Sequence, residues 1–232
     1  MTSKLKRTIV IACAALLAAV FLLGAKMQRT EYGGTAIYAN NAGAVFYVRA
    51  MTAEGKLKTS GSGFTVSADG LALTAAHVIR GADKVHVVLP DGKELADVEV
   101  VERDDLTDVA VLRLPAQEEA YPFLKLEQER LDSGETVYVI GYPLKTVKLI
   151  HDGIVSAPTA TINGVERLLI SAELASGMSG GPVICQHGAV VGLASATVRT
   201  MNGVSASPAT AQLREAVARC QTQGNMEGAM GK

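Results

Sequence analysis

Short runs of apolar and β-branched residues, each ended by a turn signal, follow one another from residue 43 to residue 207. Six runs precede a polar, acidic stretch at 115–133, and six follow it. The twelve runs span 45–50, 61–67, 71–76, 85–89, 95–103, 109–114, 136–142, 147–157, 167–172, 182–186, 189–197 and 203–207. Because closing a sheet into a barrel removes its sticky edges, this pattern predicts an all-β protein built from two small six-stranded barrels.

One amphipathic helix is expected after the last run, at 208–221. Ser207 is suited to cap its N-terminus, and Pro208 is suited to the first helical position. The residues of its apolar face, spaced to pack on a barrel, are Leu213, Ala216, Val217 and Cys220. The expected boundaries are one folded domain at 41–223, with barrel one at 41–117 and barrel two at 131–207, followed by a tail at 224–232.

The amino-terminal residues favour export. An uncharged, apolar run at 8–25 is long enough to cross a bilayer core as a single transmembrane helix, and basic residues precede it within 1–7. This order predicts a signal anchor with residues 1–7 in the cytoplasm and a linker at 26–40. A cleaved signal peptide is the alternative, although Leu23 stands where cleavage requires a small residue. Both interpretations export residues 31–232.

Charge narrows the range of partners. The chain carries 22 basic and 23 acidic residues, and five of the basic residues lie in the first 30 positions, which contain no acid. The exported part is therefore acidic, which argues against nucleic acid as a partner.

The three cysteines, Cys13, Cys185 and Cys220, show no metal-binding spacing, so we expect no metal and no other cofactor. Cys185 lies in an apolar run and Cys220 lies on the apolar face of the expected helix, which favours buried free thiols. A disulfide between Cys185 and Cys220 is the alternative in an exported protein.

The most distinctive local motif is the glycine-rich segment at 176–182, with the sequence SGMSGGP. Glycines beside a serine permit a tight turn whose backbone N–H groups converge on one point, as an oxyanion hole beside a nucleophile requires. The same residues fit the nucleophile elbow of α/β-hydrolases, but that fold needs an acid and then a histidine after the serine. His187 is the only histidine after Ser179, and no acidic residue lies between the two. The elbow is therefore excluded, and a plain glycine-rich loop remains the alternative.

A base for Ser179 must then come from upstream, where histidines stand at three positions. His77 ends an apolar run among small residues, whereas His86 and His151 lie within strand-like runs. Spacing alone does not decide among these histidines.

The acid that orients the base is expected to be buried beside a strand. Asp108 opens an apolar run, so its carboxylate is expected at the edge of a barrel, whereas Asp104 and Asp105 have the character of a solvated turn. A strand-capping role for Asp108 is the alternative.

Six sequence fragments carry a family resemblance: GSGF at 61–64, TAAHV at 74–78, RDDLTDVA at 103–110, GYP at 141–143, GIVS at 153–156 and GMSGG at 177–181. In this order they resemble the trypsin-like protease domain of the HtrA (Deg) family, over residues 40 to 220. Each fragment is weak by itself, but six in one order, with His77, Asp108 and Ser179 among them, are highly specific. The resemblance implies a chymotrypsin-like double barrel with its active site between the barrels.

The resemblance also implies a role for each residue. Ser179 is the nucleophile, His77 is the general base and later the general acid, and Asp108 orients the imidazole. The backbone N–H groups of Gly177 and Ser179 form the oxyanion hole. The implied substrates are polypeptides in an unfolded or extended state.

The specificity pocket departs from the family pattern. Family members carry Asn-Pro where this chain has Ala175 and Ser176, and the pocket floor corresponds to Glu173, with Leu174 and Ser195 as further pocket residues. A buried carboxylate at Glu173 favours Lys or Arg at the cleavage site. If Glu173 points into solvent instead, small aliphatic residues, which the family more often accepts, are the alternative.

The main hypothesis is a membrane-anchored serine endopeptidase, periplasmic in a bacterium, acting in protein quality control or regulated proteolysis. A catalytically silent chaperone or binding module on the same fold and a small-ester hydrolase are the alternatives. The residues after Ser179 are too few for the PDZ domain common in this family, so none is expected. Family members commonly form homotrimers through residues near the start of the domain, a role open here to Tyr32, Tyr38, Phe46 and Tyr47.

Overall fold

A computed structural model describes residues 30–96, 98–128, 130–197 and 203–230, and Glu31–Lys232 form one compact unit. The expected anchor at 8–25 and Cys13 lie outside the described residues. Among the helices of the described part, none is long and apolar enough to cross a membrane. The anchor therefore stays a prediction.

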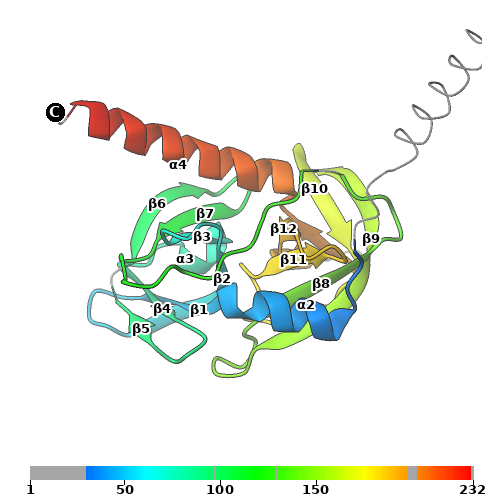
Figure 1. Cartoon of the computed structure of the whole chain (residues 1–232), viewed down its shortest axis with the longest axis horizontal. Helices are drawn as coiled ribbons and strands as arrows, with labels where there is room; N and C mark the ends of the chain where they lie inside the picture. The colour runs from blue at the N-terminus through cyan, green and yellow to red at the C-terminus, as the bar shows by residue number, and fades with distance from the viewer. Residues whose placement is uncertain (1–29, 97, 129, 198–202, 231–232) are drawn as a thin grey trace, which may run out of the picture. The chain divides into compact units, whose positions relative to one another are not determined.

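The compact unit consists of two curled antiparallel sheets that lie side by side (Figure 1). The first sheet has the strand order β5-β4-β1-β2-β3-β7-β6 and the second has the order β12-β11-β8-β9-β10-β14-β13. The strands of the first are β1 (Val45–Met51), β2 (Leu57–Thr65), β3 (Leu71–Ala75), β4 (Lys84–Val88), β5 (Glu94–Leu95), β6 (Glu99–Asp104) and β7 (Val109–Arg113). The strands of the second are β8 (Thr136–Gly141), β9 (Leu149–Ile162), β10 (Val165–Ile170), β11 (Pro182–Cys185), β12 (Val190–Leu193), β13 (Ala196–Thr197) and β14 (Ser205–Ser207). The prediction of an all-β protein with two curled sheets is confirmed, and we call these sheets barrel one and barrel two.

Each barrel has seven strands rather than the expected six, because two predicted runs are each divided. The run at 95–103 is divided where the Val98 N–H leaves its ladder and donates to the Val85 carbonyl at 2.8 Å. The run at 189–197 is divided at Ala194, whose N–H donates to the Gly181 carbonyl at 2.8 Å and whose carbonyl accepts from the Gly180 N–H at 2.7 Å. In the second case the backbone of Ala194 is bonded to the glycine-rich loop and not to a neighbouring strand.

Two apolar clusters fill the barrels. The larger fills barrel one, where Phe46 and Phe64 are almost fully buried, and extends to residues of barrel two such as Ile184 and Leu193. The smaller lies within barrel two around Val139, Ile170 and Met178. Burying one such side chain contributes about 1.5–3 kcal/mol to folding, so the two cores are the main source of stability.

A short helix, α2 (Gly34–Asn41), occupies part of the expected linker, and η1 (Ala42–Ala44) leads from it into β1. Ile37 is fully buried in the larger apolar cluster, and the Asn41 side-chain amide donates to the Ile37 carbonyl at 2.7 Å. The sequence shows no sign of this helix, because its apolar residues do not fall on one face and Gly33 provides no side-chain cap.

The carboxyl-terminal helix, α4 (Thr210–Met230), begins later and ends later than the expected 208–221. The Pro208 carbonyl accepts a hydrogen bond from the Leu193 N–H at 3.1 Å, and Ala209 bridges to Gly192, so the chain is still paired with β12 at these positions. Ser207 is therefore a buried strand residue of β14 and not a helix cap. The helix continues through most of the expected tail, although Gly224 and Gly228 are poor helix formers.

The expected packing face of α4 is confirmed at Leu213, Ala216 and Cys220, which are buried against β7, β6 and β12 (Figure 1). At the end of this contact the Arg219 guanidinium donates to Glu102 Oε1 of β6 from two nitrogens, at 2.8 and 2.6 Å. The helix thereby lies on strands of both barrels.

Candidate active site

His77 and Asp108 are paired on barrel one. His77 lies in α3 (Ala76–Ile79), one helical turn that follows β3, and Asp108 directly precedes β7, the neighbour of β3 in the sheet. His77 Nδ1 and Asp108 Oδ2 are 2.8 Å apart, and the His77 backbone N–H donates to Asp108 Oδ1 at 2.9 Å. Both carboxylate oxygens are therefore used to hold one residue. Because Nδ1 is used in this contact, Nε2 is the ring nitrogen that remains for Ser179, and the His77 side chain is 38% exposed.

Asp108 adopts a backbone conformation that non-glycine residues rarely take, with φ at 65°. Such strain persists where the surroundings over-determine it, commonly at functional sites. The Ala76 N–H donates to the Asp108 carbonyl at 3.2 Å, which holds this conformation from the β3 side. Burial by itself raises the pKa of the Asp108 carboxyl, but hydrogen bonds from His77 and Ser195 and the charge of His77 outweigh it, so the pKa lies below its ordinary value.

Ser195, expected in the substrate pocket, instead contacts Asp108. Its hydroxyl donates to Asp108 Oδ2, the same oxygen that faces His77. Ser195 follows β12 in barrel two, so this hydrogen bond joins the barrels at the carboxylate. It contributes to keeping Asp108 ionised and in one orientation.

Ser179 lies in barrel two, in the glycine-rich loop before β11. Its Oγ donates to the Ser195 carbonyl at 3.2 Å, and among the described residues no hydrogen bond joins it to His77. Ser195 thus contacts both Asp108 and Ser179, which brings all three predicted triad residues into one cluster. Hydroxyl–imidazole hydrogen bonds of this kind are often long in substrate-free structures and tighten on binding.

Gly177 has a φ of 97°, which glycine alone adopts without strain. A Cβ at this position would lie 2.6 Å from the Tyr142 carbonyl oxygen and 3.0 Å from Pro143 Cα. No described residue accepts a hydrogen bond from the N–H of Gly177 or of Ser179. Two free backbone donors beside a serine hydroxyl are what an oxyanion hole requires.

Two further residues join the barrels around the site. Ser62 of β2 is fully buried and bonds to the backbone of both Gly177 and Ser179. Arg167 of β10 donates to the Thr107 carbonyl and, at 2.9 Å, to the Leu106 carbonyl, immediately before Asp108. Sequence reasoning missed both roles. Ser62 stands within the GSGF fragment, which was a usable signal, whereas nothing in the sequence marks Arg167.

The pocket residues are less well supported than the triad. Glu173 is exposed, so it is not the buried carboxylate that specificity for Lys or Arg would need. Leu174 is half-buried and packs against the core of barrel two. The contrast arises because residues 171–175 form an extended loop, in which neighbouring side chains point in different directions.

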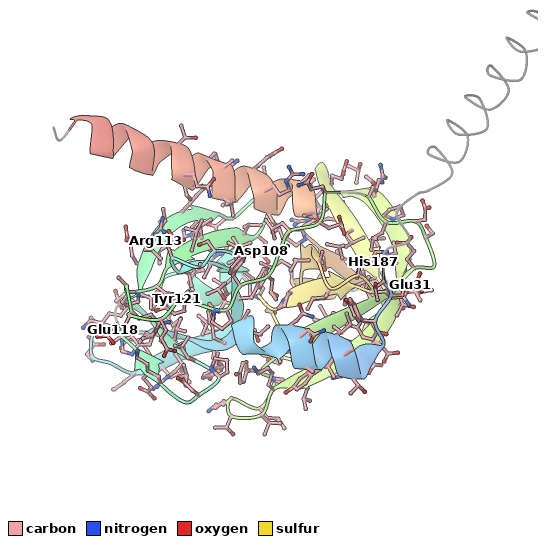
Figure 2. All side chains as sticks on the ribbon, viewed as in Figure 1. Glu31, Asp108, Arg113, Glu118, Tyr121 and His187 are labelled. Atoms are coloured by element: carbon pink, nitrogen blue, oxygen red, sulfur yellow. The ribbon has the colours of Figure 1, made fainter. Side chains whose placement is uncertain are left out.

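The other histidines and the thiols lie apart from the cluster. His86 and His151 are strand residues of β4 and β9, as expected. His187 lies in the turn after β11, near Glu31 and distant from Asp108 (Figure 2), and its neighbour Gln186 accepts from the Tyr32 N–H at 2.7 Å. Cys185 and Cys220 are buried and form no disulfide with each other, so that alternative is wrong.

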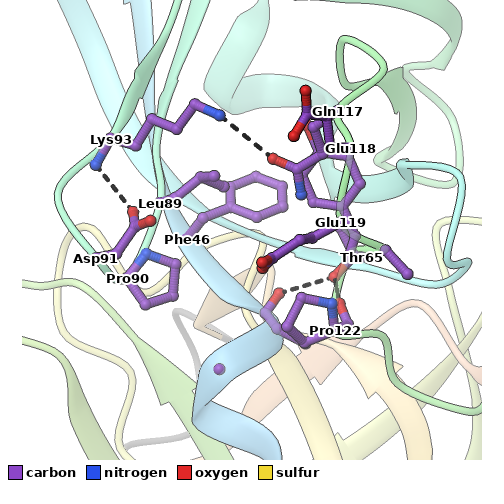
Figure 3. A pocket seen from close by; sticks show the side chains of 14 residues that line it. Phe46, Thr65, Leu89, Pro90, Asp91, Lys93, Gln117, Glu118, Glu119 and Pro122 are labelled. Carbon is purple, nitrogen blue, oxygen red and sulfur yellow. Dashed lines mark hydrogen bonds between the residues drawn. The ribbon is translucent and has the colours of Figure 1, made fainter.

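A cavity of about 530 Å³ opens on barrel one, but none of the predicted site residues lines it (Figure 3). Its wall includes Phe46, Pro122 and the acidic residues Asp91, Glu118 and Glu119. Throughout the described part of the chain, no three His, Cys, Asp or Glu residues are grouped closely enough to hold a metal ion.

Comparisons with known proteins agree with this geometry. The model of the trypsin-like peptidase domain matches residues 61–193, more than half of the chain, so the chain belongs to this family. A relative from Halomonas elongata, named "Probable periplasmic serine endoprotease DegP-like", is 40% identical over 140 residues, which cover 59% of this chain and 29% of the relative. The mitochondrial serine protease HTRA2 of Bos taurus is 33% identical over 181 residues, which cover 75% of this chain and 39% of the relative.

The crystal structure of a serine endoprotease from Yersinia pestis superposes with a TM-score of 0.73 at 26% identity, over 84% of this chain and 69% of that one. The two curled sheets therefore have the chymotrypsin-like arrangement that the resemblance implied. The chain spans between 29 and 39% of the length of the two curated relatives described above. Together these findings support a serine endopeptidase of the HtrA type.

Proposed function

We propose that this chain is an exported serine endopeptidase that cleaves unfolded or extended polypeptides with Ser179, His77 and Asp108. The observation that carries the proposal is the doubly hydrogen-bonded His77–Asp108 pair, which shares Ser195 with the hydroxyl of Ser179. A capping aspartate in a plain turn has no need of such an arrangement.

The proposed reaction follows from this geometry. Ser179 Oγ attacks the carbonyl carbon of the scissile peptide bond, while His77 Nε2 takes its proton and Asp108 stabilises the imidazolium that forms. The oxyanion accepts hydrogen bonds from the N–H groups of Gly177 and Ser179. His77 then gives the proton to the leaving amine, and the acyl-enzyme is hydrolysed by a water that His77 activates in the same way.

Small aliphatic residues are the proposed preference at the cleavage site. The exposed position of Glu173 leaves no buried charge there to pair with Lys or Arg, and the neighbouring Leu174 packs against the core of barrel two. Family members more often accept such residues.

Export is proposed from the apolar run at 8–25, and the printed names of DegP-like relatives, which call those proteins periplasmic, support it. Membrane anchoring by that run and assembly into a homotrimer stay predictions. Of the residues open to a trimer contact, Phe46 and Tyr47 are buried in barrel one, whereas Tyr32 is 36% exposed.

The test is digestion of an unfolded, reduced and alkylated protein by the full chain, with a Ser179→Ala variant as the matched control. We expect the wild type to cut and the variant to leave the substrate intact, with cut sites after Ala, Val or other small residues. Cuts only after Lys or Arg would contradict the specificity proposal. Equal cutting by both proteins would show that Ser179 is not the nucleophile.

A catalytically silent binding module is the second candidate, and one observation favours it: the Ser179 hydroxyl bonds to the Ser195 carbonyl and not to His77. Binding of the unfolded protein without any cutting would support this candidate and overturn the proposed endopeptidase.

A further inference from the structure

All of the polar groups of Ser62 are hydrogen-bonded, and two of them join the strand β2 of barrel one to the glycine-rich loop of barrel two. Its N–H donates to the Ser179 carbonyl at 2.8 Å, and its hydroxyl donates to the Gly177 carbonyl at 2.8 Å. The same hydroxyl accepts from the Tyr142 N–H at 2.9 Å. Its carbonyl accepts from the Thr74 hydroxyl of β3 at 2.7 Å.

The two residues that Ser62 holds are those whose N–H groups face the proposed oxyanion. A carbonyl that is fixed by a hydrogen bond fixes ψ of its own residue, so Ser62 restrains Gly177 and Ser179 together. Tyr142 restrains Gly177 from the other side, because its carbonyl oxygen would lie 2.6 Å from a Cβ there. Ser62 thus anchors Gly177 and Ser179 through the peptides that follow them, next to the peptides that carry the two N–H donors.

The close approach depends on the glycines around Ser62. A Cβ on Gly61 would lie 2.7 Å from the Ser179 carbonyl oxygen, and a Cβ on Gly141 would lie 3.0 Å from the Ser62 hydroxyl. Ser62 itself is fully buried, so water does not replace its hydroxyl. Its hydroxyl has one donor, which Gly177 uses, and an acceptor that Tyr142 uses.

We propose that Ser62 is a positioning residue that sets the two oxyanion donors, acting through Gly177 and Ser179 without touching the substrate. This inference rests on the proposed endopeptidase function. It assigns to barrel one, which carries the base and the acid, the further task of shaping the oxyanion hole of barrel two.

Thr65→Val provides a matched control in the same strand. Thr65 is also buried, and its hydroxyl also bonds to the backbone, with its one proton between the carbonyls of Pro122 and Ala44 (Figure 3). It lies beside the cavity on barrel one and has no contact with the glycine-rich loop. The two variants therefore remove similar buried hydrogen bonds, and only one of the bonds reaches the oxyanion donors.

The experiment compares the full-length wild type, Ser62→Ala and Thr65→Val, each normalised by active-site titration. One readout is kcat and KM for a peptide substrate. The other is the affinity for a peptide trifluoromethyl ketone, in which Ser179 Oγ adds to the ketone carbon, its proton moves to His77 and the resulting oxyanion occupies the hole. A transition-state mimic loses affinity in parallel with kcat/KM only when transition-state contacts are lost.

For Ser62→Ala we expect kcat to fall about 10- to 100-fold with KM unchanged, and the inhibition constant of the ketone to rise by the same factor. The matching peptide alcohol, which forms no oxyanion, should bind as it does to the wild type. Thr65→Val should lower thermal stability and leave both constants within about threefold. If Ser62→Ala does not fold, Ser62→Cys tests the same point, with parallel shifts of about three- to tenfold because sulfur is the weaker hydrogen-bonding atom.

Wild-type constants in titrated Ser62→Ala would overturn the inference and leave the endopeptidase intact. Equal losses in Ser62→Ala and Thr65→Val would also overturn it, because they would indicate a general effect of stability. A wild type that neither cleaves peptide nor binds the ketone would overturn the proposed function, and the inference with it.

Discussion

The two halves of the candidate site are held in different ways. On barrel one, His77 and Asp108 bond directly to each other, twice, and adjacent strands of one sheet carry them. On barrel two, Ser179 and Gly177 lie in a loop whose carbonyls bond to Ser62 of the opposite barrel. The acid–base pair is thus built mainly from contacts within barrel one, with Ser195 of barrel two added at the carboxylate, whereas the backbone of the glycine-rich loop is bonded to both barrels.

This difference has a consequence for the catalytic state. Barrel one fixes His77 whether or not substrate is present, because both Asp108 oxygens hold it. The Ser179 hydroxyl, by contrast, is directed to the Ser195 carbonyl and must turn from it before it can donate to His77. We therefore expect substitutions in the glycine-rich loop to lower the catalytic rate more than they lower the stability of the fold.

The largest expected effect comes from removing the nucleophile. Ser179→Ala should lower kcat by about 10⁴- to 10⁶-fold, since the triad residues act as a unit. The hydroxyl makes one 3.2 Å hydrogen bond, so thermal stability should change little. Peptide hydrolysis and a thermal melt measure the two quantities. A loss of activity below about 100-fold would mean that another group attacks the substrate.

Asp108→Asn should lower kcat by about 10⁴-fold, because an amide cannot stabilise the imidazolium and favours the wrong tautomer of His77. Asparagine tolerates a positive φ, so the strained backbone should survive the change. The control is Asp105→Asn, which alters an exposed residue paired with Arg80 and Arg103 and should retain full activity. Equal losses in both variants would contradict a triad that contains Asp108.

Gly177→Ala should reduce kcat by about 100- to 1,000-fold by turning one oxyanion donor away. The new Cβ meets the Tyr142 carbonyl at a φ of 97°, so either the peptide or Tyr142 must shift. Gly134→Ala separates the causes, because Gly134 has a similar φ of 92° but no heavy atom within 4 Å of its Cβ position. It should lose some stability and no activity, and inactivation by both variants would refute the local explanation.

The acid dependence of stability should be smaller in Asp108→Asn than in the wild type. The folded-state pKa of Asp108 lies below the value of about 3.9 in an unfolded chain. Its contribution to stability is therefore complete above the unfolded pKa and is lost as the pH falls through the folded pKa. Urea unfolding at pH 7, 5 and 3.5 measures this difference. Parallel pH curves for the two proteins would show that Asp108 is not held as an ion.

The smallest expected effect concerns chemical labelling of two thiols, Cys185 in β11 and Cys220 in α4. Cys185 and Cys220 are buried, and burial raises the pKa of Cys220 to about 11. At pH 8 only about one thiol in a thousand at Cys220 is then ionised, so maleimide should modify neither cysteine until the chain is unfolded. Peptide mapping before and after denaturation measures this protection. Rapid native labelling of either residue would contradict the packing.

Much of the fold could be predicted because its evidence is local in the sequence. The alternation of short apolar runs and turns predicts both curled sheets, and the order of six fragments selects His77 from four histidines that spacing alone does not separate. The two divided runs could not be foreseen. The break at Ala194 depends on hydrogen bonds to the glycine-rich loop, and these exist only after the sheet has formed.

The missed features share one physical cause, which is long-range pairing. Ser62 and Arg167 bond to backbone atoms of the site that lie 60 to 117 positions away in the sequence. Contacts over such distances leave no periodic pattern in the sequence. The helix α2 is stabilised by burial of two residues, Ile37 and Asn41, rather than by an amphipathic pattern. The exposure of Glu173 likewise depends on the path of its loop and not on its distance from Ser179.

The most direct test of the central claim, that the two halves form one catalytic unit, is labelling of the full chain with a fluorophosphonate followed by peptide mapping. We expect one adduct, on Ser179. It should form at least about 100-fold more slowly in Asp108→Asn, because the acid on one barrel activates the serine on the other. No adduct in the wild type, an adduct on another residue, or equal rates in the two proteins would contradict it.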